Sequence, residues 1–469
     1  MDLSKPYDEE IYETEQFIKK LRNKSKATEE SSWEKFKASL IVIQNSEREL
    51  FVLFFINIML SLDYYILTTM IPLYFSQEEG ASDTEAGVIF GLVGIVIGIL
   101  AVFLGPFVNK LGCKQSLIVS GGFTFIGYLL LLSTRNIIVN LIGVICFLTV
   151  GCSMSWSVVE LGAKLYTAKE ARNTSNSLLM IGNFFSGILA GTAIDFIWTN
   201  NGNINNKYFT IYSTAAFAAG LSFLAAISMR EPRETETEEE EEIIFSRNLY
   251  IKKKFWRFLA LIFLLILLRS GCFGHLDATF PKYLTRQEGE KAHFGAYLAL
   301  HSATMLCGTI GFTPISYNFS SYSLILAGAV MGSIAPLFLA IGGSTFYFIC
   351  FVLVVSAGES LWVPRLLDYT IRIAPKGEEG TYLALCNCPF YFGMIVTGIF
   401  SGNLLEMYCP EEGENNCDKM WLIIGICGIV IPILLFMFRK ILEQPDEEEN
   451  PYMPCFKEGN INYDKVPIN

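Results

Sequence analysis

The feature that most restricts the fold of this chain is a series of long apolar segments. A transmembrane helix needs roughly 20 predominantly apolar residues, and twelve stretches meet that condition. They lie at 50–75, 85–108, 116–133, 137–166, 174–198, 209–229, 255–284, 293–313, 321–342, 344–372, 379–406 and 419–441. The composition agrees, because 52% of the 469 residues are hydrophobic and only 17% are charged, as is typical of membrane proteins with many spans. The sequence therefore predicts an all-α membrane protein with twelve transmembrane helices.

An acidic segment divides these spans into two sets of six. It reads REPRETETEEEEEIIFSRNLYIKKK, and such a block of like charges repels itself and stays solvated. Tyr166-Thr167 before the segment is matched by Tyr369-Thr370 after it, and other short matches follow in the same order, as in a duplicated unit. The predicted parts are a cytosolic tail with an amphipathic surface helix at 1–49, a six-helix bundle at 50–229, an acidic cytosolic linker at 230–254, a second six-helix bundle at 255–441 and a cytosolic tail at 442–469.

Two spans are preceded by the sequence pattern of a capping box, in which a Ser is followed three residues later by a Glu. Ser46 and Glu49 form this pattern before the first span, and Ser82 and Glu85 form it before the second. The two side chains of a capping box satisfy backbone N–H groups at the start of a helix. We therefore expect both helices to begin at these positions.

The Lys and Arg residues of the short loops predict the orientation of the spans. Most of them, including those of the linker, fall on one side of the membrane, and few fall on the other. Because cytosolic loops carry the excess of positive charge, both termini are expected in the cytosol. Cys409 and Cys417 share a polar loop on the opposite side, and they would form a disulfide if that compartment is oxidising. The sequence does not indicate which membrane carries the protein.

Several classes of function are disfavoured by the sequence. The net charge of −11 comes largely from the linker and the C-terminal tail, and it argues against a nucleic-acid partner. The chain has no zinc-ligand spacing and no phosphate-binding glycine loop ending in Lys and Ser or Thr, which an ATP-driven pump would need. No nucleophile with a plausible His partner stands out. We therefore expect no metal, no cofactor and no enzyme activity.

The loop between the second and third spans reads Gly105-Pro-Phe-Val-Asn109-Lys110-Leu-Gly112-Cys-Lys114. It resembles the signature loop of the major facilitator superfamily, which has a Gly, then an acid and a base, then a second Gly and further bases. Asn109 stands where the family usually has Asp. The resemblance implies that this loop is a cytosolic gate that latches two six-helix halves together. The corresponding loop of the second half contains no charged residue.

A further resemblance covers nearly all of the membrane region. Four stretches carry it: Leu62-Asp63-Tyr64-Tyr65, Lys164-Leu-Tyr166-Thr167, His275-Leu-Asp277 and the segment from Glu359 to Thr370. They are similar to a protist and algal branch of the superfamily, which is itself distantly similar to proton-coupled oligopeptide transporters. The paired Glu and Arg of the peptide transporters are absent from the first span, so a peptide substrate does not carry over. The resemblance implies a cavity between the halves, lined by spans one, four, seven and ten.

Ionisable side chains inside the spans mark the candidate site. Each costs roughly 2.5–3.5 kcal/mol at the centre of a bilayer, so it should face a water-filled cavity or an opposite charge. The candidates for the substrate and proton-coupling cavity are Asp63, Tyr64, Tyr65, Glu160, Lys164, Asn183, Arg269, His275, Asp277, Glu359 and Arg365. His275, with Asp277 two residues on, is a candidate proton relay. A hydrogen-bonded wall residue is the alternative.

The charges of these residues suggest separate roles. Asp63 and Glu359 are the candidates for binding a coupling proton, because an apolar wall stabilises the neutral form of a carboxyl group. Static ion pairs that hold the halves together are the alternative. Arg269 is expected to suit an anionic group of the substrate, since its charge cannot be titrated away. Glu160 and Lys164 lie one helical turn apart, and we expect them to neutralise each other.

Together these observations predict a secondary transporter that moves a small organic solute across a membrane by alternating access. Its expected partners are the lipid bilayer, a small-molecule substrate, a coupling proton or other ion, and a protein partner if it belongs to a membrane complex. The alternative is a transport-inactive homologue that serves as a receptor or as a structural subunit of such a complex. Uptake or counterflow in vesicles separates the two.

Overall fold

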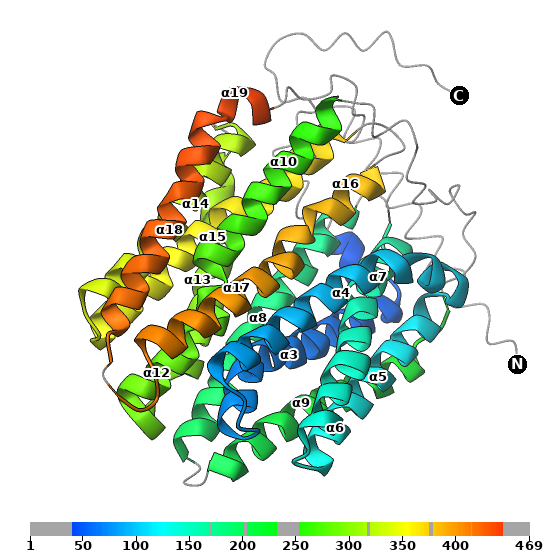
Figure 1. The fold of residues 1–469 in the computed structure, drawn as a ribbon. Coiled ribbons are helices and arrows are strands. Elements are labelled where there is room, and N and C mark those ends of the chain that lie inside the picture. Colours follow the sequence, from blue (N-terminus) through cyan, green and yellow to red (C-terminus); the bar gives the residue numbers. More distant parts are fainter. Residues whose placement is uncertain are drawn as a thin grey trace, which may run out of the picture.

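The computed structural model describes residues 40–168, 171–200, 204–231, 253–316, 319–374, 379–413 and 415–443. Helices and no strand occur in this part of the chain. Figure 1 shows two helical bundles, one from the blue to teal part of the sequence and one from the green to red part. Most of the expected amphipathic helix, of the linker and of the C-terminal tail lies outside the described residues. The two bundles are called the first and the second half below.

The spans of the first half follow the predicted segments closely. They are α3 (Arg48–Gln77), α4 (Asp83–Leu111), α5 (Cys113–Ser133), a fourth span made of α6 (Ile137–Ile142), a π-helical turn (Gly143–Leu148) and α7 (Thr149–Tyr166), α8 (Arg172–Asn200) and α9 (Ile204–Ser228). The end of the spans next to residues 231 and 253 is called the linker end, and the opposite end the far end.

In the second half, three spans consist of more than one helical segment. The spans are a seventh made of α10 (Lys253–Leu268), a π-helical turn (Arg269–Phe273), α11 (His275–Ala278) and α12 (Phe280–Glu288), α13 (Phe294–Ser316), α14 (Ser321–Ile341), α15 (Thr345–Ile373), an eleventh made of α16 (Glu379–Cys386) and α17 (Cys388–Tyr408), and a twelfth made of α18 (Cys417–Met437) and α19 (Arg439–Leu442). A short 3₁₀ turn (Gly289–Lys291) precedes α13.

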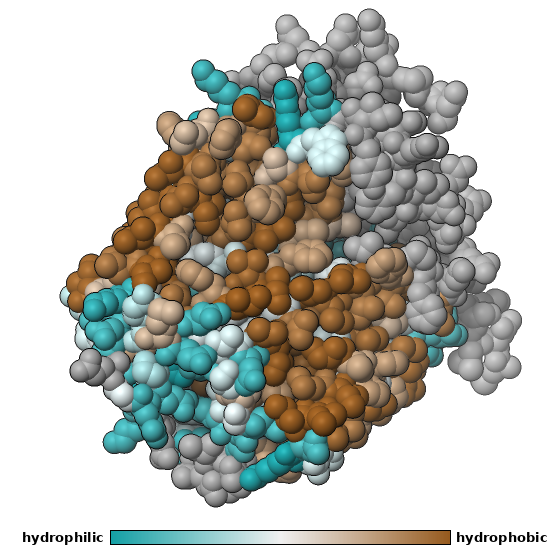
Figure 2. Space-filling model, in the orientation of Figure 1, coloured by the Kyte–Doolittle hydropathy of each residue, from teal (hydrophilic) through white to brown (hydrophobic). Residues whose placement is uncertain are grey.

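The surface of the molecule suits a bilayer. Eleven helices in the described part of the chain are long and apolar enough to cross a membrane. The remaining predicted span is α13, which has 23 residues and is made more polar by His301 and its Ser and Thr residues. Figure 2 shows a broad apolar face, with hydrophilic residues gathered toward its ends. Large apolar side chains such as Phe103, Phe196 and Phe346 are exposed, as lipid-facing residues are.

The two predicted capping boxes have different outcomes. Ser82 and Glu85 form one at the start of α4, where each side chain accepts a hydrogen bond from the other residue's backbone N–H. The prediction at Ser46 is wrong, because the Ser46 hydroxyl donates backward to the Val42 carbonyl at 2.9 Å. Helix α3 then begins without a side-chain cap, after Glu47.

A matched pair of contacts supports the predicted duplication. The Tyr166 hydroxyl at the end of the fourth span donates to the Arg230 carbonyl at 2.8 Å. In the second half the Tyr369 hydroxyl, near the end of the tenth span, donates to the Leu442 carbonyl at the same distance. Both contacts fasten the fourth span of a half to the end of its sixth span or to the residues just after it. Tyr166 and Tyr369 are the residues that the sequence repeat pairs.

The halves approach each other most closely along two seams of small residues. Gly87 of α4 faces Gly398 of α17, and a Cβ atom on either would overlap the carbonyl oxygen of the other. Gly191 of α8 and Gly295 of α13 are related in the same way. Small residues let helix backbones come close together within a membrane. Both seams lie toward the far end, and Figure 1 shows α4 beside α17.

The seventh span is broken where it carries its charges. Its π-helical turn begins at Arg269, and α12 then starts with Pro281 in its first turn. Pro lacks the N–H that would continue a preceding helix, and π turns inside helices frequently mark functional sites. The break therefore places Arg269 in the π-helical turn and Asp277 on the short helix α11 that follows it.

Candidate functional site

A cluster of four ionisable side chains lies in the second half, beside the first. Arg269 is bonded to two carboxylates, to Glu359 at 2.9 Å and to Asp277 at 3.1 Å. His301 of α13 places its Nε2 3.8 Å from Glu359 Oε2, and its Nδ1 lies 2.8 Å from the Ser356 hydroxyl. The cluster is mostly buried, with 8% of the Glu359 side chain exposed. One cation shared by two acids leaves an excess negative charge when both acids are ionised.

The first half contributes aromatic side chains next to this cluster. Tyr65 is within electrostatic range of Arg269, Asp277 and Glu359. Tyr64 is within range of Arg269 and Asp277, and its ring meets Trp156 edge to face with centroids 5.8 Å apart. The predicted residues Tyr64 and Tyr65 are therefore brought to the space between the halves.

Asp63 is not in that space, contrary to expectation. Its side chain is buried within the first half, 1% of it is exposed, and it lies within electrostatic range of Tyr128 and Cys152 of the same half. The Tyr128 hydroxyl donates to the Asp63 backbone carbonyl at 2.9 Å. Among the described residues, no group bonds to Asp63 Oδ2. The helical turn that points Tyr64 and Tyr65 toward the second half points Asp63 into its own bundle.

Asn183 joins a neutral polar network that includes the first span. Its Oδ1 accepts hydrogen bonds from Asn57 Nδ2 and Ser61 Oγ, both at 2.8 Å. Next to this network lies a small cavity with room for about one water molecule. It is lined by Asn57, Leu60, Ser61, Tyr64, Cys152, Ser155, Trp156 and Val159. All of its polar side chains are uncharged.

Three predicted residues lie on the linker-end side of the cluster. Glu160 and Lys164 are exposed, and no ion pair between them occurs in the structure, so the expectation that they neutralise each other is wrong. Both side chains are exposed, and an exposed pair gains little over separate hydration of its two charges. Arg365 bonds to Asp368 at 2.6 Å on its own helix and does not reach Glu359.

His275 is buried on the opposite face of the seventh span. Its Nδ1 lies 2.7 Å from the Thr279 hydroxyl, which donates to the Ser401 hydroxyl at 2.6 Å. The rings of Phe400 and Trp421 flank it. The expectation of a cavity residue and proton relay at His275 is therefore wrong, and the alternative of a hydrogen-bonded wall residue describes its contacts. Asp277, two residues on, faces the other way, as the period of a helix requires.

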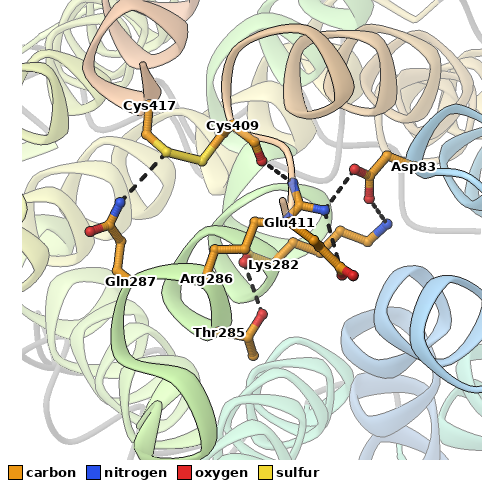
Figure 3. Close-up of a disulfide and its surroundings, with 8 residues drawn as sticks. All are labelled: Asp83, Lys282, Thr285, Arg286, Gln287, Cys409, Glu411 and Cys417. Carbon is orange, nitrogen blue, oxygen red and sulfur yellow. Dashed lines mark hydrogen bonds and ion pairs between the residues drawn. A yellow bond between two sulfur atoms is a disulfide. The ribbon is translucent and has the colours of Figure 1, made fainter. Parts of the chain in front are cut away.

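A second charged cluster joins the halves at the far end (Figure 3). Asp83, the first residue of α4, pairs with Lys282 at 2.8 Å and with Arg286 at 2.6 Å, both on α12. Arg286 also donates to the Cys409 carbonyl and lies 3.7 Å from Glu411. Cys409 and Cys417 form a disulfide, as their shared loop allowed. On the other seam, Asp195 lies 3.1 Å from His293.

The predicted gate loop is reduced to a single residue. Helix α4 includes Gly105, Asn109 and Lys110, and α5 begins at Cys113, so only Gly112 separates the helices. Gly112 has φ of +80°, and the Glu231 carboxylate lies beside its Cα. Lys114 is on the first turn of α5. The described contacts of the loop are within the first half, so a latch to the second half stays a prediction.

Sequence reasoning missed His301 in the first cluster and Asp83, Lys282, Arg286 and Glu411 in the second. His301 carried a usable signal, since it is a polar residue within an apolar span. Asp83 carried a weaker one, because acids are common in the first turn of any helix and the capping box next to it explained its position. Its pairing with Lys282, 199 positions along the chain, depends on the docking of the halves. No group of three or more His, Cys, Asp or Glu suited to a metal occurs in the described part of the chain.

Two helical halves with a charged cluster between them define a membrane transport protein. The family model of the Major Facilitator Superfamily matches residues 53–399, and the chain therefore belongs to that superfamily. It is a multi-pass membrane protein of a transporter family and not an enzyme. A relative from Bacillus subtilis (strain 168), the uncharacterized symporter YnaJ, is 21% identical over an alignment of 441 residues. The match covers 87% of this chain and 93% of the relative.

Solved structures share the fold. A POT family transporter in complex with 5-aminolevulinic acid superimposes with a TM-score of 0.68 at 13% identity, covering 84% of this chain and 97% of that one. The nucleoside transporter NupG superimposes with a TM-score of 0.66 at 12% identity, covering 84% of this chain and 100% of that one. At these identities the likeness concerns the fold alone.

Proposed function

We propose that this protein moves a small organic solute by alternating access and that a proton bound at Glu359 drives the movement. The observation that carries the proposal is the sharing of Arg269 by Glu359 and Asp277 at the boundary between the halves. With both acids ionised, the cluster has one net negative charge in a medium of low dielectric constant, where charge interactions are strong. A proton on one carboxylate removes that charge and loosens its bond to Arg269.

The contacts of Glu359 favour it over Asp277 as the acceptor. Its Oε2 has no hydrogen-bond partner among the described residues, and His301 Nε2 is 3.8 Å away. A proton on Oε2 would neutralise the carboxyl group, so the bond between Oε1 and Arg269 would weaken. Asp63 is assigned no coupling role, since it lies outside the space between the halves. We infer that it stays neutral, because burying a lone carboxylate charge is strongly unfavourable.

The far-end cluster is a contact between the halves that must open during transport. Asp83 with Lys282 and Arg286, together with the glycine seams, holds the halves together at the far end, so these contacts must separate for a solute to enter there. The Cys409–Cys417 disulfide supports placing the far end in an oxidising compartment. The linker end and both termini would then lie in the cytosol, in agreement with the loop charges.

The test measures the distance between the halves without knowledge of the solute. Spin labels are introduced at Ser133→Cys, the exposed last residue of α5, and at Ser344→Cys, in the exposed loop before α15. The full-length protein used has had its exposed native cysteines removed. The distance distribution should change with pH in this background and become independent of pH in Glu359→Gln. Asp63→Asn should respond like the parent protein.

Two other outcomes would contradict parts of the proposal. A pH response that survives Glu359→Gln but disappears in Asp63→Asn would move the proton site to the first half. A distribution that never changes with pH would contradict proton coupling and favour a transport-inactive receptor or structural subunit.

A further inference from the structure

Helix α7 presents a row of three side chains to the space between the halves. Trp156, Glu160 and Lys164 are four residues apart, so they share one face of the helix. Glu160 is exposed, yet it lies within electrostatic range of Tyr391 and Cys386 of the second half. This face of α7 is therefore directed at the second half and not at lipid.

Aromatic rings lie near the Glu160 position, since Trp156 is one helical turn away on the same face of α7. Tyr64 and Trp156 are in edge-to-face contact, and Tyr391 is within electrostatic range of both Tyr64 and Glu160. The faces of such rings attract cations, and the attraction increases when water is excluded. The adjacent cavity, which Tyr64 and Trp156 also line, offers only uncharged polar groups. A carboxylate beside several aromatic rings is suited to a positively charged group.

The described cationic side chains near this space are poorly placed to bind an anionic solute. Arg269 is engaged by two carboxylates, which disfavours the expectation that it receives an anionic group of the substrate. Arg365 is engaged by Asp368. Glu160 forms no ion pair with any described residue. Lys164 lies one turn closer to the linker end and is exposed.

We propose that the transported solute is a compact organic cation whose ammonium group binds between Glu160 and the rings of Tyr64, Trp156 and Tyr391. The proposal rests on the proposed transport function and adds the class of solute. Two negative charges remain uncompensated in the space, that of Glu160 and that of the Arg269 cluster. One solute cation and one proton on Glu359 neutralise both, so the two ligands occupy different carboxylates and travel together.

The test uses choline and two isosteres of nearly the same shape. The full-length protein in detergent is titrated with choline, with neutral 3,3-dimethylbutan-1-ol and with anionic 3,3-dimethylbutyrate, and the thermal unfolding midpoint is followed. Choline should raise the midpoint in a saturable manner, and the other two should not. Glu160→Gln should weaken the apparent affinity for choline by about tenfold or more.

Lys164→Gln is the matched control, since it alters a charge on the same face one turn away. It should leave the affinity for choline unchanged or increase it slightly. Equal stabilisation by choline and by the alcohol, tighter binding of the carboxylate, an unaltered affinity in Glu160→Gln, or no response to choline would each overturn the cation proposal. The pH response of the spin-label distance is measured independently, so it can persist when choline fails. That result would reject the solute class and retain the coupled transporter.

Discussion

The two halves share a fold but differ in how they hold a buried acid. In the second half, Glu359 and Asp277 are held by Arg269 at the surface that meets the other half. In the first half, Asp63 is enclosed near Tyr128 and Cys152, and no described side chain bonds to its Oδ2. The first half therefore presents neutral amides, hydroxyls and rings to the shared space, together with Glu160 and Lys164, whereas the second presents a linked set of charges.

This difference shows that duplication of a fold does not duplicate its chemistry. The same tyrosine-to-carbonyl contact closes both halves at the linker end, so their architecture has been kept. The charges inside have diverged, with a broken seventh span in one half and a continuous first span in the other. We infer that the second half carries the coupling chemistry and the first half contributes most of the solute contacts.

The largest expected effect comes from removing the cation of the second half. Arg269→Met leaves two buried carboxylates without their partner, and such a change typically costs about 3–5 kcal/mol. Asp63→Asn leaves no cation unpaired, so its loss of stability should be below about 1 kcal/mol. Thermal unfolding midpoints of both variants, purified in one detergent, measure the contrast. Arg365→Met, whose partner Asp368 is partly exposed, should fall between them. Equal losses in Arg269→Met and Asp63→Asn would break the comparison.

A covalent link distinguishes the far-end loops of the halves. The loop between the last two spans of the second half contains Cys409–Cys417, while the corresponding residues 199–207 of the first half, TNNGNINNK, contain no Cys. For so short a loop the chain-entropy estimate is about 2–3 kcal/mol. Replacing both cysteines by Ser should therefore lower the unfolding midpoint and loosen the Arg286 contact with Asp83.

A free cysteine serves as the control for the disulfide. Cys427→Ser on α18 removes an exposed free thiol and should leave the midpoint unchanged. Adding a dithiol reductant should reproduce the effect of the double replacement in the parent protein and have no further effect on the variant. A parent protein indifferent to the reductant, with the disulfide shown by mass spectrometry to be reduced, would contradict this role.

Both halves contribute glycines to the two seams, where their helix backbones lie close together. A Cβ on Gly295 would overlap backbone atoms of Gly191 and Asp195, whereas Gly311 on the same helix has open space around it. Overpacking of this kind typically costs about 1–3 kcal/mol. Gly295→Ala should therefore disfavour the far-end-closed conformation and lengthen the spin-label distance, while Gly311→Ala should change neither. An effect of the same size in both variants would point to helix propensity as the cause.

The smallest expected effect concerns an acid at the linker end of the second half. Hydrogen bonds from Arg439 and Ser320 hold the pKa of Glu443 below its ordinary value. Its contribution to stability is therefore present above the unfolded-state pKa of about 4.3, and it is lost as the pH falls through the lower folded-state pKa. Glu443→Gln should lower the unfolding midpoint slightly at neutral pH. The expected loss of stability is about 0.3–0.5 kcal/mol, the value typical of an exposed ion pair within a helix.

The check on Glu443 is a pH series of unfolding midpoints for the variant and the parent protein. The two curves should converge at acidic pH. A difference that grows as the pH falls would contradict the sign of the effect. Glu231→Gln changes the acid beside Gly112 in the first half. Its effect on the unfolding midpoint shows whether an acid at the linker end also stabilises that half.

The sequence by itself determined the class of protein, the number of spans and their duplication. Membrane spans are set by local composition, because a helix must satisfy its own backbone in lipid, and twelve such stretches can be counted without knowing their neighbours. The span at 137–166 has the bounds that the structure gives. The capping box at Ser82 is likewise a matter of four adjacent residues. The loop of Gly105 to Lys114 and the resemblance to the major facilitator superfamily came from sequence in the same way.

Tertiary structure alone decided which charges meet. The pairing of Arg269 with Glu359 was one of several combinations that the sequence allowed, and Asp83 with Lys282 was not foreseen. Asp63 and His275 were assigned to the cavity because they are polar residues in apolar spans, but a helix has several faces and composition does not say which one a neighbour covers. The rotation of each helix is fixed by packing against helices distant in sequence. That rotation separated buried Asp63 from Tyr64 and Tyr65, and it left Glu160 facing the opposite half.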